Sequence, residues 1–257
     1  MISYSGNLED VILQRALAGT REGHYLDIGA AMPVEDSTTY ALYERGWSGI
    51  VVDPLLNSQH WRQERPRDIV VAAMAGATPG AGTIHVYPLA LQASTGSEAA
   101  RARLQFLGLQ GRPPVTVPRV TANDLLAEHG ANRPLHLVSI DVEGMEAEVL
   151  AGLDLRRHRP WVMMIEAVLP GTPTPSHHAW EPAILAQGYS RVYFDGVNRF
   201  YLADEQRGLL DHFAVPPNVF DQFIRNNDRR TEQRIAELQA RIAILSAELV
   251  TLRPRNR

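Results

Sequence analysis

The stretch LHLVSIDVEGMEAEVLAG, residues 135–152, decides the fold. It opens with an apolar run, Leu135–Ile140, that has the length and composition of a buried strand. The turn Asp141-Val142-Glu143-Gly144 follows, and a helical pattern continues to Leu150 before Gly152 ends it. A buried strand that passes through a short acidic turn into a helix predicts one unit of a parallel α/β sheet.

The same alternation of apolar runs and helical patterns extends in both directions along the chain. Helices are predicted at residues 8–18, Ser37–Arg45, Asn123–His129 and Trp180–Gln187. Further strands are predicted at His24–Ile28, Ile50–Asp53, Ile69–Met74, Thr83–Tyr87, Val115–Val120 and Trp161–Ile165. Asp195-Gly196-Val197-Asn198 is a turn signal between strands Tyr189–Phe194 and Arg199–Ala203. We therefore predict a mostly parallel sheet that ends in an antiparallel hairpin.

Composition excludes several chemistries. The chain has no cysteine and no lysine, and it has 25 arginines. Thiolate metal sites, cysteine nucleophiles, Schiff-base lysines and the lysine of a phosphate-binding loop are therefore ruled out. A net charge of −4 argues against a general nucleic-acid binder. No apolar run is long enough to span a membrane, and no secretory signal precedes the first helix, so we expect a cytoplasmic protein.

Acidic residues gather at the ends of the predicted strands. These ends are Asp27, Asp53, Met74, Asp141 and Glu166, and four of the five carry a carboxylate. Any one such acid is as readily a helix cap or a solvated loop residue. In open α/β sheets, however, ligands bind beyond the carboxyl ends of the strands. Four acids together therefore favour a ligand site.

The first two strand ends indicate which ligand. Asp27 precedes a tight turn at Gly29, and Asp53 closes the next strand, where an acid can accept both hydroxyls of a ribose. NAD and S-adenosylmethionine share that feature. Gly29 is followed by Ala30-Ala31-Met32-Pro33, so the glycine-rich fingerprint is absent. A pyrophosphate needs bare backbone at a helix N-terminus, whereas S-adenosylmethionine has no phosphate. The missing glycine-rich fingerprint therefore favours S-adenosylmethionine, a methyl donor, over NAD.

Five blocks in the same order resemble the FkbM family of methyltransferases. They are residues 3–13 (SYSGNLEDVIL), residues 25–50 around YLDIGA and GWSGI, residues 140–152 (IDVEGMEAEVLAG), residues 159–167 (RPWVMMIEA) and residues 194–201 (FDGVNRFY). The similarity spans roughly residues 3–203. It departs from the family at Gly6, where glutamine is usual, and at Asp53, where glutamate is common.

The resemblance implies a class I, Rossmann-like methyltransferase with a doubly wound, mostly parallel seven-stranded sheet. It also implies S-adenosylmethionine as cofactor. The residues we expect to bind it are Asp27, Gly29, Ala30, Ser37, Thr39, Asp53, Pro54, Ala73 and Asp141.

The catalytic candidates are Asp141, Glu143 and Glu166. Methyl transfer to an alcohol needs a base, or a metal that acidifies the hydroxyl. Some relatives on this fold hold Mg²⁺ with such carboxylates, and three oxygen ligands suit that ion. Two alternatives are that Asp141 only holds the cofactor and that Glu143 only caps the following helix. His177 and His178 could also supply a base, although adjacent loop histidines are usually solvated.

The composition changes from Thr231 onward. Ile235, Leu238, Ile242, Leu245, Leu249 and Leu252 form an a/d heptad seam. We expect a methyltransferase domain at 1–227 and a coiled-coil helix at 228–257, with a polar junction at 226–230. Through residues 231–252 this helix is expected to form a homo-oligomer, namely a dimer. The alternative is a terminal helix docked on its own domain.

The sequence as a whole predicts an O-methyltransferase acting on a hydroxyl of a sugar, a glycan or a secondary metabolite. Three rivals stay open. One is an N-methyltransferase on a related substrate. The second is an NAD-dependent oxidoreductase, against which the missing glycines and the missing lysine count. The third is a degenerate, non-catalytic partner protein, against which the complete set of strand-end acids counts.

Overall fold

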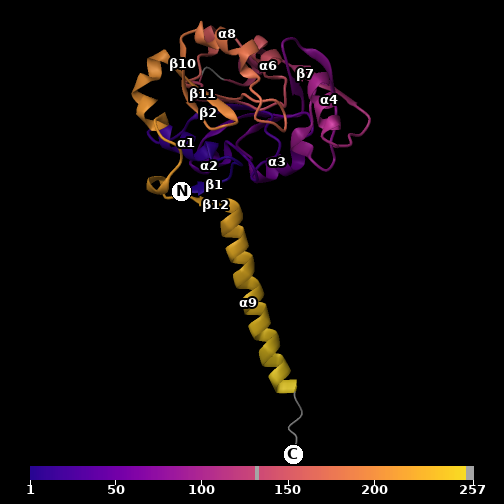
Figure 1. Ribbon diagram of the computed structural model, residues 1–257. Coiled ribbons are helices and arrows are strands. Elements are labelled where there is room, and N and C mark those ends of the chain that lie inside the picture. Colours follow the sequence, from indigo (N-terminus) through magenta and orange to yellow (C-terminus); the bar gives the residue numbers. More distant parts are fainter. Residues whose placement is uncertain (131–132, 253–257) are drawn as a thin grey trace, which may run out of the picture.

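The computed structural model describes residues 1–130 and 133–252, and for residues 247–252 it describes the backbone alone. A seven-stranded sheet lies at its centre (Figure 1). In spatial order its strands are β10 (Tyr189–Phe194), β11 (Asn198–Ala203), β9 (Val162–Glu166), β8 (Leu137–Ile140), β2 (His24–Ile28), β3 (Ser48–Val52) and β4 (Ile69–Val71). Neighbours from β9 to β4 are parallel, whereas β11 runs antiparallel to both β9 and β10. The predicted α/β fold with a mostly parallel sheet is confirmed, and so is the terminal hairpin.

Helices cover both faces of this sheet because apolar side chains point to both sides of its buried strands. One core cluster joins the sheet to side chains of α5 (Ala122–His129), α6 (Glu146–Ala151), α7 (Leu155–His158) and α8 (Glu181–Leu185). The other cluster holds side chains of α1 (Glu9–Ala16), α2 (Tyr40–Glu44), α3 (Ser58–Glu64) and the 3-10 helix η3 (Asp204–Phe213). The carboxyl ends of the parallel strands are thereby left as an open edge between two packed layers.

A second, three-stranded sheet was not predicted. It consists of β5 (Met74–Ala75), β7 (Val115–Val120) and β6 (Gly80–Ile84), in that order. The single strand predicted at Ile69–Met74 is wrong, because the chain leaves the main sheet after Val71 and enters this small one. Between β6 and β7 lie the 3-10 helix η1 (Leu91–Ala93) and α4 (Glu98–Phe106).

Two predicted boundaries also need correction. The helix expected from Ser37 begins only at Tyr40, and the Ser37 hydroxyl accepts the Tyr40 backbone N–H at 3.2 Å in the turn before it. The polar junction expected at 226–230 is instead the beginning of the long helix α9 (Asn226–Leu252). Just before it, β12 (Ile224–Arg225) pairs in parallel with β1 (Ile2–Ser3).

Helix α9 extends away from the sheet and its covering helices (Figure 1). The seam residues with described side chains, Ile235, Leu238, Ile242 and Leu245, are 43–63% exposed. In the described part of α9, these side chains are therefore not packed against the sheet and its covering helices. The side chains of Leu249 and Leu252, and residues 253–257, lie outside the described part. No helix in the described ranges is both long and apolar enough to cross a bilayer.

Candidate functional site

A cavity of about 360 Å³ lies at the carboxyl ends of β2, β3 and β8. Its position is the one that open α/β sheets reserve for ligands, and its volume suits a small molecule. The wall includes the catalytic candidate Glu143 and seven of the nine predicted cofactor residues, which are Asp27, Gly29, Ala30, Asp53, Pro54, Ala73 and Asp141. The parallel register of β2 with β3 and β8 brings these ends together.

Asp27 is held from behind by a buried network. Its Oδ2 accepts the Thr39 hydroxyl at 2.6 Å, and Thr39 Oγ1 in turn accepts from the fully buried Arg65 at 3.0 Å. Burial raises the pKa of Asp27, while the Thr39 hydrogen bond and the Arg65 charge oppose that shift. Ser37 and Thr39 do not line the cavity. Their predicted contact with the cofactor is thus replaced by a supporting position, because both hydroxyls are engaged by Arg65.

Gly29 is required by the protein itself as well as by any ligand. Its φ is +86°, and a Cβ there would lie 1.6 Å from the backbone oxygen of Asp141. Any side chain would therefore push β2 and β8 apart just where both enter the cavity. This close approach fixes Asp141 beside the end of β2.

Asp53 lies half-buried at the end of β3. Its two carboxylate oxygens accept the backbone N–H groups of Leu55 at 2.7 Å and Ala31 at 3.4 Å. Burial raises the pKa of Asp53, and these backbone donors oppose the shift. Ala31 and the cavity residue Asp36 both have positive φ, at 46° and 53°. Backbone strain of this kind concentrates at ligand sites, because the surrounding structure must hold it in place.

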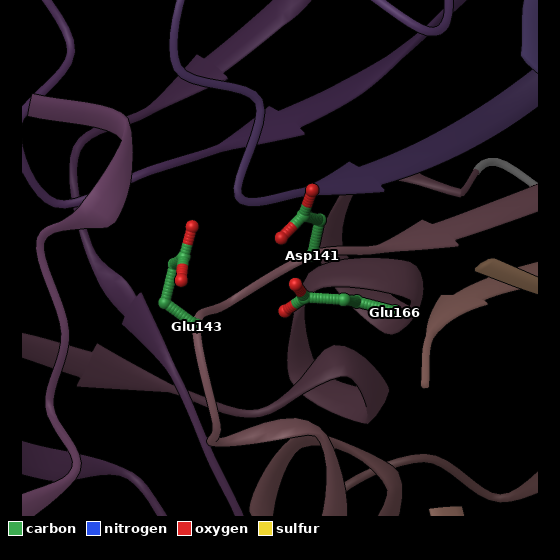
Figure 2. A group of neighbouring side chains, drawn as sticks. All are labelled: Asp141, Glu143 and Glu166. Atoms are coloured by element: carbon green, nitrogen blue, oxygen red, sulfur yellow. The ribbon is translucent and has the colours of Figure 1, made fainter. Parts of the chain in front are cut away.

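Three carboxylates converge beside this first group. Asp141 and Glu143 follow β8 and Glu166 ends β9, and Figure 2 shows their carboxyl groups turned toward one another. One oxygen of each lies within 4.8 Å of the others. Glu166 is 6% exposed and Glu143 is half-buried, whereas Asp141 is open to the cavity. The Oε2 atom of Glu166 is buried and has no hydrogen-bond partner among the described residues.

Burial raises the pKa of all three carboxyls. Water reaches Asp141 through the cavity, yet the protein surrounds this group closely enough for burial to dominate its shift. Repulsion adds to each pKa, from Glu146 on Asp141 and from Asp141 on both Glu143 and Glu166. Three negative charges cannot coexist here without compensation. The cluster must hold a proton or a cation, and its hard oxygen donors fit Mg²⁺.

Glu143 does not cap the following helix, so that alternative is contradicted. Helix α6 begins after Met145 without a side-chain cap, and it is Glu146 that holds the preceding turn, because its Oε1 accepts the backbone N–H groups of Gly144 at 3.0 Å and Val142 at 3.4 Å. Glu143 has a φ of +54°, and its backbone oxygen accepts the Thr95 hydroxyl at 2.7 Å. The Glu143 carboxyl is therefore free for the cavity that it lines.

Sequence reasoning missed one acid of the cavity, Glu9. Glu9 lines the cavity from α1, with its carboxylate accepting from Asn7 N at 2.8 Å and Asn198 Nδ2 at 3.1 Å. The residues at 91–96 contribute Leu91, Gln92, Ser94 and Gly96. Glu9 is the first residue of α1 and is followed by a second acid, Asp10, so no local pattern marks it for the cavity. The expectation that His177 is solvated is wrong, because that ring is 4% exposed.

A family model described as the methyltransferase FkbM domain matches residues 27–191. The match includes Asp27, Asp53 and all three converging carboxylates. No curated protein and no solved structure shows significant similarity to the chain.

Proposed function

The chain belongs to the FkbM methyltransferase family, and on that premise we propose that it is an S-adenosylmethionine-dependent O-methyltransferase. The acceptor is a hydroxyl of a sugar, a glycan or a secondary metabolite. One observation carries the proposal: a single cavity is lined by Asp27 and Asp53, each held by hydrogen bonds from its own neighbours, and by the carboxylates of Asp141 and Glu143. The first pair suits an adenosine, and the second suits proton removal.

The donor half of the cavity binds the nucleoside. Asp53 accepts the ribose hydroxyls, and Asp27 and Gly29 form the floor beneath the rest of the donor. Thr39 acts from behind by keeping Asp27 in place, and Ser37 accepts from Arg65, the residue that donates to Thr39. Ala30 and Ala31, which follow Gly29 where a pyrophosphate site would need glycines, support a phosphate-free donor. Bound in this half of the cavity, S-adenosylmethionine would supply its methyl group beside Asp141.

The catalytic half removes the proton of the acceptor. The acceptor oxygen attacks the methyl carbon, the bond between that carbon and sulfur breaks, and the sulfonium leaves as a neutral thioether. The hydroxyl proton passes to a carboxylate oxygen of Asp141 or Glu143. Burial and repulsion raise the pKa of these groups, which makes them stronger bases than ordinary carboxylates.

Asp141, Glu143 and Glu166 would also hold Mg²⁺. The support is their donor chemistry, their mutual distances of at most 4.8 Å and the unpartnered Oε2 of Glu166. Bound there, the ion would lower the pKa of a hydroxyl in contact with it.

Calorimetry separates this function from that of an NAD-dependent oxidoreductase. S-adenosylhomocysteine titrated into the full chain should bind one to one, and NAD⁺ should not bind. Labelled methyl transfer from S-adenosylmethionine to a panel of sugars and hydroxylated metabolites then identifies the acceptor class. Tight binding of NAD⁺ without any binding of S-adenosylhomocysteine would overturn the proposal.

We also propose that the chain self-associates through residues 231–252. The methyltransferase domain would be 1–227 and the coiled-coil helix 228–257, with α9 beginning two residues before that boundary. Burying a large aliphatic side chain contributes roughly 1.5–3 kcal/mol, so a seam left in water at Ile235, Leu238, Ile242 and Leu245 is costly. A second copy of α9 offers the same heptad and covers it.

A further inference from the structure

Glu143 is held in a conformation that its residue type disfavours. Its φ is +54°, in the left-handed region, and Gly144 after it has a φ of +95°. A non-glycine residue persists there only when its surroundings impose the conformation. The turn therefore has an external brace, and the brace decides where the Glu143 carboxyl lies.

Thr95 supplies one side of that brace. It is 1% exposed, and its hydroxyl donates to the Glu143 backbone oxygen at 2.7 Å while accepting the Ser97 backbone N–H at 2.9 Å. Its own backbone is paired with His85 in both directions, at 2.8 and 3.1 Å. Thr95 is thus a fixed point to which the turn is tied.

The other side of the brace is Glu146, which accepts the Gly144 backbone N–H at 3.0 Å. The turn is held between the segment before α4 and the first turn of α6. On either side of Thr95, Ser94 and Gly96 line the cavity. One short segment therefore forms a wall of the cavity and also fixes the turn that delivers Glu143.

We propose that Thr95 is a positioning residue for methyl transfer, which acts by holding the Glu143 carboxyl against Asp141. The inference rests on the proposed role of Glu143 in the reaction. Without the Thr95 hydroxyl, the peptide after Glu143 loses its donor, and φ relaxes toward the ordinary helical or extended range. The carboxyl then turns away from Asp141. Displacing a reacting group by about 1 Å can cost on the order of a hundredfold in rate.

The test compares three single variants. Thr95→Val keeps the shape and removes the hydroxyl, whereas Thr95→Ser keeps the hydroxyl. Thr172→Val is the matched control, because Thr172 also donates its hydroxyl to a backbone oxygen, that of Leu169 at 3.0 Å, in a turn away from the cavity wall. Each is crystallised with S-adenosylhomocysteine, and kcat is measured with the acceptor from the methyl-transfer panel.

We expect Thr95→Val to lower kcat by about 10- to 100-fold and to rotate Glu143 away from Asp141. Affinity for S-adenosylhomocysteine should change less than about twofold, because the donor half is untouched. Thr95→Ser and Thr172→Val should match wild type. In a Glu143→Gln background, Thr95→Val should cause no further loss, since both changes act on one group.

A Thr95→Val crystal structure with Glu143 unmoved would overturn the inference, and so would a full multiplicative loss in the double variant. Failure of the proposed function looks different, because wild type itself would then not bind S-adenosylhomocysteine. Whether or not S-adenosylhomocysteine binds, comparing the crystal structures of wild type and Thr95→Val shows whether Glu143 has moved. Should Thr95→Val fold poorly, loss of kcat in Thr95→Ser would count against the inference.

Discussion

The cavity and helix α9 are incomplete in opposite ways. At the cavity, the carboxyls of Asp141 and Glu143 lie beside the buried Glu166, and burial and mutual repulsion raise the pKa of all three. Helix α9 carries aliphatic side chains with too much water around them, at 43–63% exposure from Ile235 to Leu245. The uncompensated carboxylates of the cavity indicate that a ligand or cation binds there. The exposed aliphatic side chains of α9 indicate instead that another protein surface covers them. The two regions should therefore respond independently to mutation.

The largest effect should come from the cavity. Asp141→Asn and Glu143→Gln should each lower kcat by about a hundredfold or more, because each removes a charge that takes up or stabilises the acceptor proton. The mass of the assembly should not change. Glu148→Gln is the matched control, since this exposed acid also follows β8 but lies outside the cavity wall. Near-normal turnover in both cavity variants would show that the catalytic assignment is wrong.

Next in size is the effect on donor affinity. Asp53→Ala should weaken binding of S-adenosylhomocysteine by roughly 1.5–3 kcal/mol, which is about 10- to 150-fold, through loss of charge-assisted hydrogen bonds to the ribose. Asp154→Ala is a fair control. Asp154 also accepts two backbone N–H groups, those of Arg156 and Arg157, but it caps α7 away from the cavity wall. Equal losses in both variants would mean that Asp53 matters only for the fold.

A change in the helix should alter assembly without altering the cavity. Leu245→Lys puts a charge into the seam, so light scattering should show a dimer in wild type and half that mass in the variant. Ala240→Lys, on the outer side of the same heptad, should leave the dimer intact. Both variants should bind S-adenosylhomocysteine as wild type does. A monomeric wild type would exclude self-association under those conditions.

The smallest effect concerns the metal. Millimolar Mg²⁺ should raise the thermal midpoint of wild type by a few °C, since an ion that binds only the folded state stabilises it by mass action. Glu166→Gln should lose most of this response, and addition of EDTA should reverse it in wild type. No response in wild type would leave the three carboxyls to share protons instead, and the metal proposal would be dropped.

The sequence predicted that the strand-end acids meet at one edge of the sheet, because the parallel register of the strands brings their ends together. Once β2, β3 and β8 are recognised as buried runs, Asp27, Asp53 and Asp141 must meet at one edge. Ser37 and Thr39 lie behind the cavity wall, because both hydroxyls accept hydrogen bonds from Arg65, and this contact across 26 to 28 positions of sequence has no local signal.

Other cavity residues come from long-range packing that no local pattern encodes. Glu9 reaches the cavity from α1, and Thr95 meets Glu143 across 48 positions of sequence. The departure of the chain from the main sheet after Val71 also has no local signal, because the apolar run continues through Val70, Val71 and Ala73. The acceptor, the cytoplasmic location and the coiled coil stay predictions.

The central claim is that the strand-end acids divide into a donor half and a catalytic half of one cavity. A crystal structure of the full chain with S-adenosylhomocysteine tests it most directly. We expect the ribose hydroxyls on Asp53, the adenosine over Gly29, and the sulfur facing the carboxyls of Asp141 and Glu143. A ligand bound elsewhere, or a sulfur turned away from those carboxyls, would contradict the account.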